Sequence, residues 1–463
     1  MRVISRVRHA NLHGNWAVVL LLVMVAGTSA GCEKVGHDNL DKWMSTEKGV
    51  GKLRKAVRGD HDPDLRAHAA HNLILHPEGL LVDVKDAMGS MSPENANAIM
   101  AKLAVRLWES AQKGLTSELQ VPSNSNIEAK DALFELRDFA SFDTKKVIHG
   151  YLLDWLGAYY EARSQLGRNA GRQVIREIGA EAAPRLLASA RSILAQPPGE
   201  SGEHLKVGDE LLAGLAWSGT AEAAGFLMDL VDKDYKDDTL TKRALAALHE
   251  AYVQPLAGSA LSGREALTPH AERLGQLARN ESLPGVMNND AVDLLHAAGP
   301  PACLEPFAKM AAMPAAQQAF RWVGVQRGLR CAGASGLVQL VEAMPPSVAY
   351  ERALLQKYVW KEILDAPGQA KVAEQLRMLL RSSSPVARVT AVEVLGKIAE
   401  STRRAEDVAG IRALANDRAK LAGWWGPQSD VPKAERKKDP TIGQVAAEVA
   451  QRVEGLAKAP KTK

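Results

Sequence analysis

The sequence has little cysteine, few aromatic residues and few signals for β-strands. Three cysteines in 463 residues are too few for a domain that disulfides hold together. Alternating β-branched runs and Asn-Gly or Asp-Gly turns, which mark strands and hairpins, are nearly absent. A disordered chain is excluded as well, because 46% of the residues are hydrophobic and the formal net charge is only +4. The sequence therefore predicts an all-α protein.

Local catalytic signatures are also missing. There is no Gly-x-Ser-x-Gly elbow and no phosphate-binding loop. Gly49-Val50-Gly51 opens like a dinucleotide loop, but Arg54 stands where the third glycine belongs. His249-Glu250 has no second histidine at the spacing of a zinc protease. We therefore expect no enzyme activity and no cofactor, and we keep an enzyme or small-ligand carrier built on the helices as the alternative.

The first residues have the pattern of an export signal. A basic start (Arg2, Arg6 and Arg8) comes before an apolar run at residues 16–26, and no acidic residue precedes Glu33. This run of 11 residues is short beside the roughly 20 that a membrane-spanning helix needs. Residues 1–31 are therefore predicted to be a signal peptide.

Small residues lead from the apolar run to the first cysteine. Ser29-Ala30-Gly31-Cys32 resembles the lipobox of bacterial lipoproteins, with Ser29 where that family usually has Leu. The resemblance implies that acyl chains such as palmitate are attached to Cys32 and that residues 32–45 form a lipidated N-terminus and linker. It also implies an exported, membrane-anchored protein, and Glu33 favours the periplasmic side of the outer membrane over the inner membrane. The alternative is an ordinary signal peptide, cut after Ala30 or Gly31.

The rest of the chain has the periodicity of amphipathic helices. Apolar residues recur at i, i+3 and i+4, and alanine is common among them. Segments 62–73 and 384–395 align without gaps, with Pro, Arg, Ala and Leu at the same four positions. Each segment begins with an N-cap residue followed by Pro, which is tolerated at the first helical position because its missing N–H would have no partner there. These starts are Asp62-Pro63 and Ser384-Pro385.

A second recurring signal is a glycine between two helical patterns. We expect Gly179, Gly219, Gly299 and Gly333 each to end a helix in the left-handed region, with the next helix beginning within a few residues. Two of the intervals are 40 and 80 residues, and a period near 40 is typical of HEAT-type repeats.

The aligned helical segments and the glycines between them resemble HEAT repeats. Together with the lipobox, they make the chain resemble a bacterial HEAT-repeat domain-containing lipoprotein. The resemblance implies an α-solenoid (superhelix) of HEAT-like helical hairpins over residues 46–457, with repeat boundaries undefined between about 90 and 140. It further implies a non-catalytic scaffold that binds proteins through the solenoid surface. A generic Ala-rich helical bundle is the alternative fold.

Histidines are concentrated near the N-terminus of the mature chain. His61, His68, His71 and His76 lie within 16 residues, and His68 and His71 are spaced i, i+3. A divalent metal would need three or more converging ligands. We predict no metal site, with His68 and His71 as the only candidates, and expect these side chains to face solvent.

The other two cysteines, Cys303 and Cys331, lie at hairpin junctions about one repeat apart. Equivalent positions on successive repeats are neighbours, and an oxidising envelope favours a disulfide. Such Cα atoms are about 10 Å apart, more than the roughly 5.5 Å that a disulfide prefers, so the bridge requires a local shift. Two buried thiols are the alternative.

Trp424 and Trp425 lie in the most loop-like stretch, residues 422–438. They form either a recognition knob for a partner or a cap over the last repeat, and we favour the cap. Residues 458–463 are predicted to be a disordered basic tail.

The positive charge does not indicate nucleic acid as a partner. Loss of Arg2, Arg6 and Arg8 with the signal peptide lowers the formal net charge from +4 to +1. The predicted partners are a membrane, through the N-terminal lipid, and one or more unidentified envelope proteins. The sequence gives no indication of the oligomeric state.

Overall fold

The computed structural model describes most of the chain after the predicted signal peptide. The described residues are 34–46, 48–115, 121–157, 160–195, 207–232, 238–255, 258–402, 405–436 and 438–458. They are helical, and the only strand-like pairing among them is an isolated bridge between Lys420 and Thr441. In this part of the chain no helix combines the length and apolarity needed to cross a membrane. Cys32 and the predicted signal peptide 1–31 lie outside the described residues.

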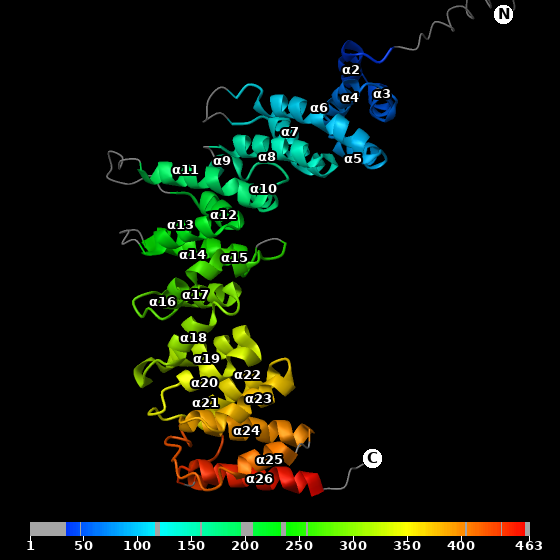
Figure 1. Cartoon of the computed structure of the whole chain (residues 1–463). Helices are drawn as coiled ribbons and strands as arrows, with labels where there is room; N and C mark the ends of the chain where they lie inside the picture. The colour runs from blue at the N-terminus through cyan, green and yellow to red at the C-terminus, as the bar shows by residue number, and fades with distance from the viewer. Residues whose placement is uncertain are drawn as a thin grey trace, which may run out of the picture. The chain divides into compact units, whose positions relative to one another are not determined.

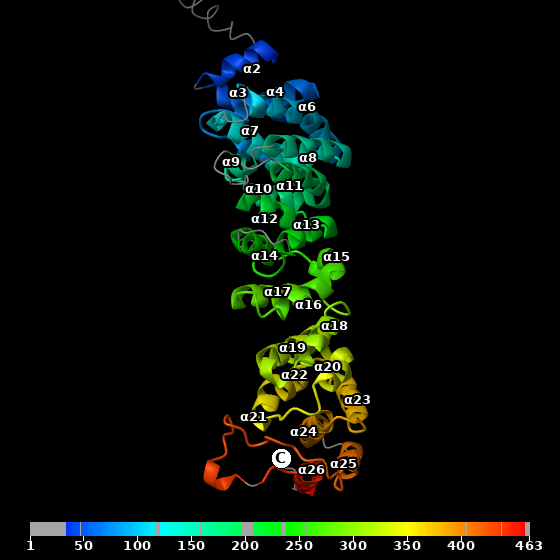
Figure 2. The same cartoon turned by 90° about the vertical axis from the view of Figure 1, so that its left-hand side faces the viewer.

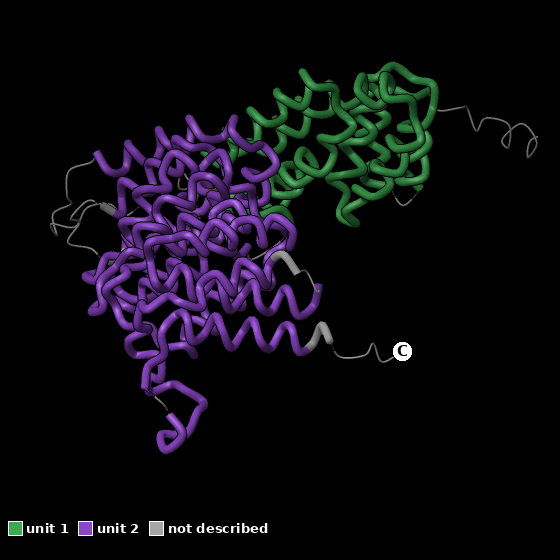
Figure 3. The backbone as a smooth tube through the Cα atoms, turned by 60° about the horizontal axis from the view of Figure 1, so that its bottom comes forward, with its two compact units in different colours: residues 1–170 green, residues 171–463 purple. Residues whose placement is uncertain are grey.

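The helices gather into two compact units, coloured separately in Figure 3. Unit 1 is Met1–Ala170 and unit 2 is Gly171–Lys463. The single array predicted for residues 46–457 spans both units and stays a prediction.

Unit 1 is built from helices that pack on the next helix but one. Its α-helices are α2 (His37–Met44), α3 (Gly49–Arg58), α4 (Pro63–Ile74), α5 (Leu81–Gly89), α6 (Pro93–Gln112), α7 (Asn124–Leu136), α8 (Phe142–Leu156) and α9 (Tyr160–Arg163). Helix α2 packs on α4, α4 on α6, and α6 on α8.

Two local findings in unit 1 bear on the predictions. Helix α4 begins at Pro63 as predicted, and the Asp62 carboxylate caps it by accepting a hydrogen bond from the Asp64 N–H at 2.8 Å. Residues 37–44, expected to be linker, form α2 instead, because Leu40 and Trp43 are buried against the neighbouring helices.

Unit 2 contains the remaining helices, which are labelled in Figure 1. They are α10 (Gly171–Ile178), α11 (Ala183–Ala195), α12 (Asp209–Trp217), α13 (Ala221–Asp232), α14 (Asp238–Tyr252), α15 (Gly263–Leu267), α16 (Ala271–Ala278), α17 (Gly285–Ala298), α18 (Leu304–Ala311), α19 (Gln318–Ala332), α20 (Leu337–Ala343), α21 (Arg352–Leu355), the π-helix η7 (Gln356–Trp360), α22 (Lys361–Asp365), α23 (Gln369–Leu379), α24 (Pro385–Thr402), α25 (Ala405–Arg412) and α26 (Ile442–Lys458). Helix α24 begins at Pro385, as predicted.

The helices of unit 2 form two rows. In the first row α10, α12, α14, α17, α19, α22, α24 and α26 each pack on the next. In the second row α11, α13, α15 with α16, α18, α20 and α23 do the same, and α25 joins α23 through an ion pair between Arg377 and Asp407 at 2.8 Å. The first-row helices α12, α14, α17, α19, α24 and α26 also pack on a second-row helix next to them in sequence, so the core lies between the rows.

Glycines mark the turns from the first row to the second. Gly179, Gly219, Gly299 and Gly333 all have positive φ, between 57° and 72°, as predicted. Gly258 and Gly368, at the two corresponding turns that the sequence analysis did not single out, also have positive φ. A glycine is favoured there because L side chains rarely adopt this conformation.

Candidate functional site

A π-helical turn interrupts the helical stretch from α21 to α22. This turn is η7, and π-turns are rare and often found at functional sites. Val359 and Trp360 in the turn are buried, whereas Gln356 and Lys357 are exposed. The turn therefore has one side in the core and one side at the surface.

Aromatic side chains gather around η7, in a chain with only 5% aromatic residues. The ring of Trp322 stacks on Tyr358 with centroids 5.6 Å apart and meets Tyr350 edge-on at 6.0 Å. The rings of Trp360 and Trp424 lie 6.2 Å apart. Trp322, Tyr350, Trp360 and Trp424 are all buried, so the cluster forms a rigid core behind the surface of η7.

Trp424 belongs to a long loop, residues 413–441, that connects α25 to α26. Figure 2 shows the loop, in orange to red, extending away from these helices. The Arg436 guanidinium holds the loop together by donating hydrogen bonds to three backbone carbonyls, those of Trp425, Ser429 and Val431, at 2.9–3.3 Å. The loop is therefore a defined structure, wider than the predicted range 422–438.

The two tryptophans of the loop have different environments. Trp424 is buried, with 3% of its surface exposed, and its carbonyl accepts a hydrogen bond from the Arg352 N–H at 3.1 Å. Trp425 is half-buried. Trp424 thus packs into unit 2 against Trp360 of η7 and leaves Trp425 nearer the surface.

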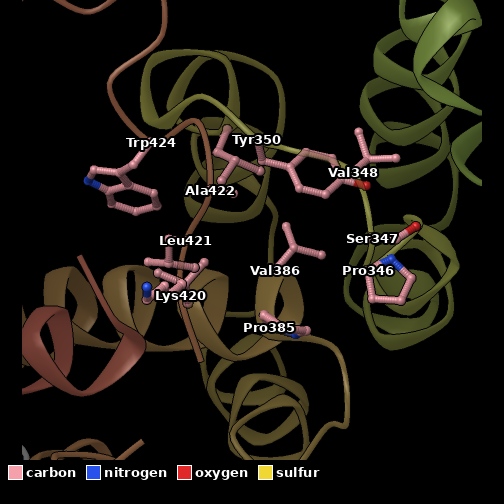
Figure 4. Close-up of a pocket in the computed structure, with 12 residues that line it drawn as sticks. Pro346, Ser347, Val348, Tyr350, Pro385, Val386, Lys420, Leu421, Ala422 and Trp424 are labelled. Atoms are coloured by element: carbon pink, nitrogen blue, oxygen red, sulfur yellow. The ribbon is translucent and has the colours of Figure 1, made fainter. Parts of the chain in front are cut away.

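A pocket of about 70 Å³ opens beside Trp424 (Figure 4). Four segments line it: residues 346–350, Leu355 at the end of α21, the first turns of α24, and residues 420–424. Burial raises the pKa of Tyr350 to about 12, and its hydroxyl donates to the Pro345 carbonyl at 2.8 Å. Small-molecule sites usually measure about 300–1,000 Å³, so this pocket suits a single apolar side chain.

Charged side chains connect neighbouring helices of the first row. The Arg172 guanidinium on α10 donates hydrogen bonds to Glu210 on α12 and to Glu250 on α14, the latter at 2.8 Å. These hydrogen bonds raise the pKa of Arg172 well above its usual value. The Trp217 indole N–H also donates to Glu250, at 3.2 Å.

Ion pairs continue along this row toward the C-terminus. They are Arg327 with Asp293, Arg330 with Glu362, Arg352 with Glu393, and Arg452 with Glu400. The pair of Arg330 with Glu362 is bidentate, a specific geometry that fixes the register of α19 against α22.

The structure places the histidines of α4 differently from the prediction. His68 is buried, with 8% exposed, and His71 is half-buried, so the expectation that they face solvent is wrong. The reason is that α2, α3, α5 and α6 all pack on α4 and cover more than one of its faces. The described residues contain no group of three or more His, Cys, Asp or Glu that could hold a metal.

His68 instead belongs to a hydrogen-bonded chain that joins α2 to α4. Its Nε2 lies 2.7 Å from the Asp41 carboxylate and its Nδ1 lies 2.8 Å from Nδ1 of His37. The Asp41 carboxylate can only accept a hydrogen bond, so neutral His68 carries its proton on Nε2. The Nδ1 atom of His68 then accepts a hydrogen bond from the Nδ1–H group of His37. His71 lies 2.7 Å from the Ser110 hydroxyl through Nε2.

We expect unit 1 to lose stability as the pH falls below about 6.5. Burial lowers the pKa values of His68 and His71 below 6.5, so the folded state favours their neutral forms. This stabilisation is present above pH 6.5 and is lost as the pH falls through the lowered values. Protonated His68 would also bring two Nδ1–H groups together. Amide hydrogen exchange of α2 and α4 against pH measures the effect.

The surrounding charges do not reverse this expectation. Asp41 faces His68 and favours its protonation, whereas Arg106 and His37 oppose it. His68→Gln should flatten the pH profile of exchange in α2. An unchanged profile in this variant would contradict the expectation, and His76→Gln is the control.

A disulfide joins Cys303 and Cys331, the bridge that the sequence left open against two thiols. Their Cα atoms are 6.8 Å apart, closer than the distance expected between equivalent positions of successive repeats. Cys303 is completely buried, at the start of α18, and Cys331 lies near the end of α19.

Removing this bridge with Cys303→Ala/Cys331→Ala should lower the free energy of unfolding of unit 2 by about 2–4 kcal/mol. The bridge closes a loop of 28 residues, which restricts the unfolded chain. Denaturant unfolding measures the change. Equal alkylation of both cysteines with and without prior reduction would show that no bridge is present.

The sequence analysis did not single out several residues that the structure brings together. These are His37, Arg172, Tyr350 and Trp360. None belongs to a local motif. The only signal in the sequence is the density of aromatic residues between 350 and 360.

Comparison with known proteins gives no family. No protein-family model and no curated protein matches the chain. Human deoxyhypusine hydroxylase in complex with glycerol aligns over 77% of this chain and 96% of its own, at 15% identity and a TM-score of 0.21. An engineered protein aligns over 89% of this chain and 99% of its own, at 16% identity and a TM-score of 0.30. At these TM-scores neither similarity carries an argument about fold or activity.

Proposed function

We propose that the protein is an envelope-anchored lipoprotein that acts as a non-catalytic, protein-binding scaffold. In this proposal its helices form HEAT-like hairpins stacked as an α-solenoid. The observation that carries the proposal is the pair of helical rows in unit 2, in which each helix packs on the next of its row. In a repeat array each repeat contacts only its neighbours, and the surface along the array is free to bind.

The turns and the last helix support this proposal. Positive-φ glycines recur at residues 179, 219, 258, 299, 333 and 368, at six successive turns from the first row to the second. Helix α26 buries Val445 and Val449 and exposes Gln444, Glu448 and Gln451. A polar outer face is what the terminal repeat of an array requires for solubility.

The ion pairs of the first row favour binding over catalysis. Arg172, Arg330 and Arg352 are each held by a carboxylate on another helix. Charged groups paired in this way give a rigid patterned surface. The pocket beside Trp424 is also small for a carrier of drug-sized ligands.

Photo-crosslinking in the intact envelope tests the scaffold. A photoreactive residue is placed in the full chain at exposed positions of the first row, Lys361 and Gln444, and of the second row, Arg191 and Lys371. We expect a defined protein neighbour from one row and none from the other. Recovery of no protein neighbour at any position would overturn the proposal.

The lipid anchor rests on the sequence around Cys32 and has its own test. Labelling cells with an alkyne fatty acid should mark the full chain, and Cys32→Ala should abolish the label and release the protein from the membrane fraction. Cys331→Ser is the matched control and should keep the label. A Cys32→Ala protein that stays labelled would rule out this site.

A further inference from the structure

The exposed side of η7 lines a second hollow, of about 450 Å³, in unit 2. Its lining residues come from α21, η7, α22, α24 and the loop 413–441: Ala353, Gln356, Lys357, Lys361, Leu364, Asp365, Lys397 and Asp430. The turn η7 lines this hollow with its exposed side and carries Trp360 on its buried side. The packing of Trp360 on Trp424 therefore supports the wall of the hollow.

Three lysines converge on this hollow without an ion pair. Lys357 and Lys361 are exposed and Lys397 is half-buried. None of the three lies within 4.0 Å of a carboxylate oxygen of the described residues, although nearby arginines, such as Arg330 and Arg352, are paired. The hollow therefore presents ammonium groups without a direct ion-pair partner, which a ligand could contact.

The lining also defines the charge and shape of the ligand. Asp365 and Asp430 offset two of the three lysines, which leaves a formal charge of about +1. A single carboxylate neutralises this charge, whereas a phosphate dianion would be repelled by the two aspartates. Ala353 and Leu364 offer apolar contact to the methylene groups of a side chain.

We propose that this hollow binds a glutamate side chain in an exposed acidic segment of the protein partner. This inference rests on the proposed scaffold function and names the chemistry of its partner. The contacts are charge-assisted hydrogen bonds from Lys357, Lys361 and Lys397 to one carboxylate, with the Gln356 amide beside them.

Fluorescence anisotropy with a labelled Glu-rich peptide and the full mature chain tests the proposal. The variant Lys357→Gln/Lys361→Gln/Lys397→Gln should bind the peptide at least about tenfold more weakly, and added salt should weaken binding to the unmodified chain. The control Lys102→Gln/Lys242→Gln/Lys371→Gln makes the same change in net charge at exposed lysines outside the hollow and should bind within about twofold of the unmodified chain.

The other outcomes overturn the inference. Equal weakening in both triple variants would show a net-charge effect, and no measurable peptide binding would show that the hollow is not a site. Competition by inorganic phosphate at lower concentration than free glutamate would make it a phosphate site. Crosslinking at the first-row position Gln444 that still captures a neighbour in the triple variant of the hollow overturns this inference alone, whereas the absence of any neighbour overturns the scaffold.

Discussion

Asp131→Ala is expected to destabilise unit 1 by about 3–5 kcal/mol, because it leaves a buried ammonium group without its partner. Lys130 and Asp131 on α7 are only 3% and 1% exposed, and Lys130 Nζ lies 2.6 Å from the Asp131 carboxylate. The carboxylate also accepts hydrogen bonds from the N–H groups of Arg168 and Asn169, at 2.7 Å and 3.2 Å. The Asn169 side-chain amide donates to it as well, at 3.2 Å. The substitution removes the acceptor for all four donor groups. Amide hydrogen exchange of α7 during denaturant unfolding measures the loss.

The geometry around Asp131 makes this prediction specific. Lys130 also donates to the Leu166 and Asn169 carbonyls, so the pair fixes the segment that follows α9. Gly167 in this segment has φ +88°, and a Cβ there would lie 2.4 Å from the Asp131 carboxylate. Gly167→Ala should therefore destabilise the same segment.

Glu128→Gln is the matched control for Asp131→Ala. Glu128 lies on the same helix and pairs with Arg168, but both side chains are partly exposed, at 38% and 49%. Surface pairs contribute about 0–1 kcal/mol, so the control should be nearly neutral. Equal losses in the two variants would show that the buried pair has no special role.

Much of the helical framework could be predicted from local chemistry. Helices begin at Pro63 and Pro385 because proline is favoured at the first helical position, where its missing N–H has no partner to lose. Gly179 and Gly219 were predictable since a positive φ is costly for other residues. The solenoid and the lipid anchor at Cys32 stay predictions.

The sites depend on contacts between distant segments, which local patterns do not encode. His68 was expected at the surface because Leu65, Ala69 and Leu73 occupy one face of α4, yet neighbouring helices cover a second face. The buried position of Lys130 has no signature, because its carbonyl partners lie beyond α9. The π-turn η7 is likewise not visible in the periodicity of hydrophobic residues along the sequence.

Trp424→Ala should destabilise the C-terminal part of unit 2 by about 3–5 kcal/mol, as for other buried tryptophans. The Trp424 ring contacts Trp360 on one side, and the Arg352 guanidinium lies 5.9 Å from its centroid. Loss of the ring opens a cavity beside the pocket of Figure 4 and releases the loop 413–441 from η7. Hydrogen exchange of η7 and α24 measures the effect.

Trp425→Ala separates the packing role from a recognition role. Because Trp425 is half-buried, its removal should cost clearly less stability than Trp424→Ala. Trp424→Phe keeps an aromatic ring and leaves a smaller cavity, so it should also cost less than Trp424→Ala. If Trp424→Ala left stability unchanged but abolished crosslinking to a partner, Trp424 would be a recognition knob. Loss of stability with Trp424→Ala and loss of crosslinking with Trp425→Ala would assign anchoring to the first tryptophan and recognition to the second.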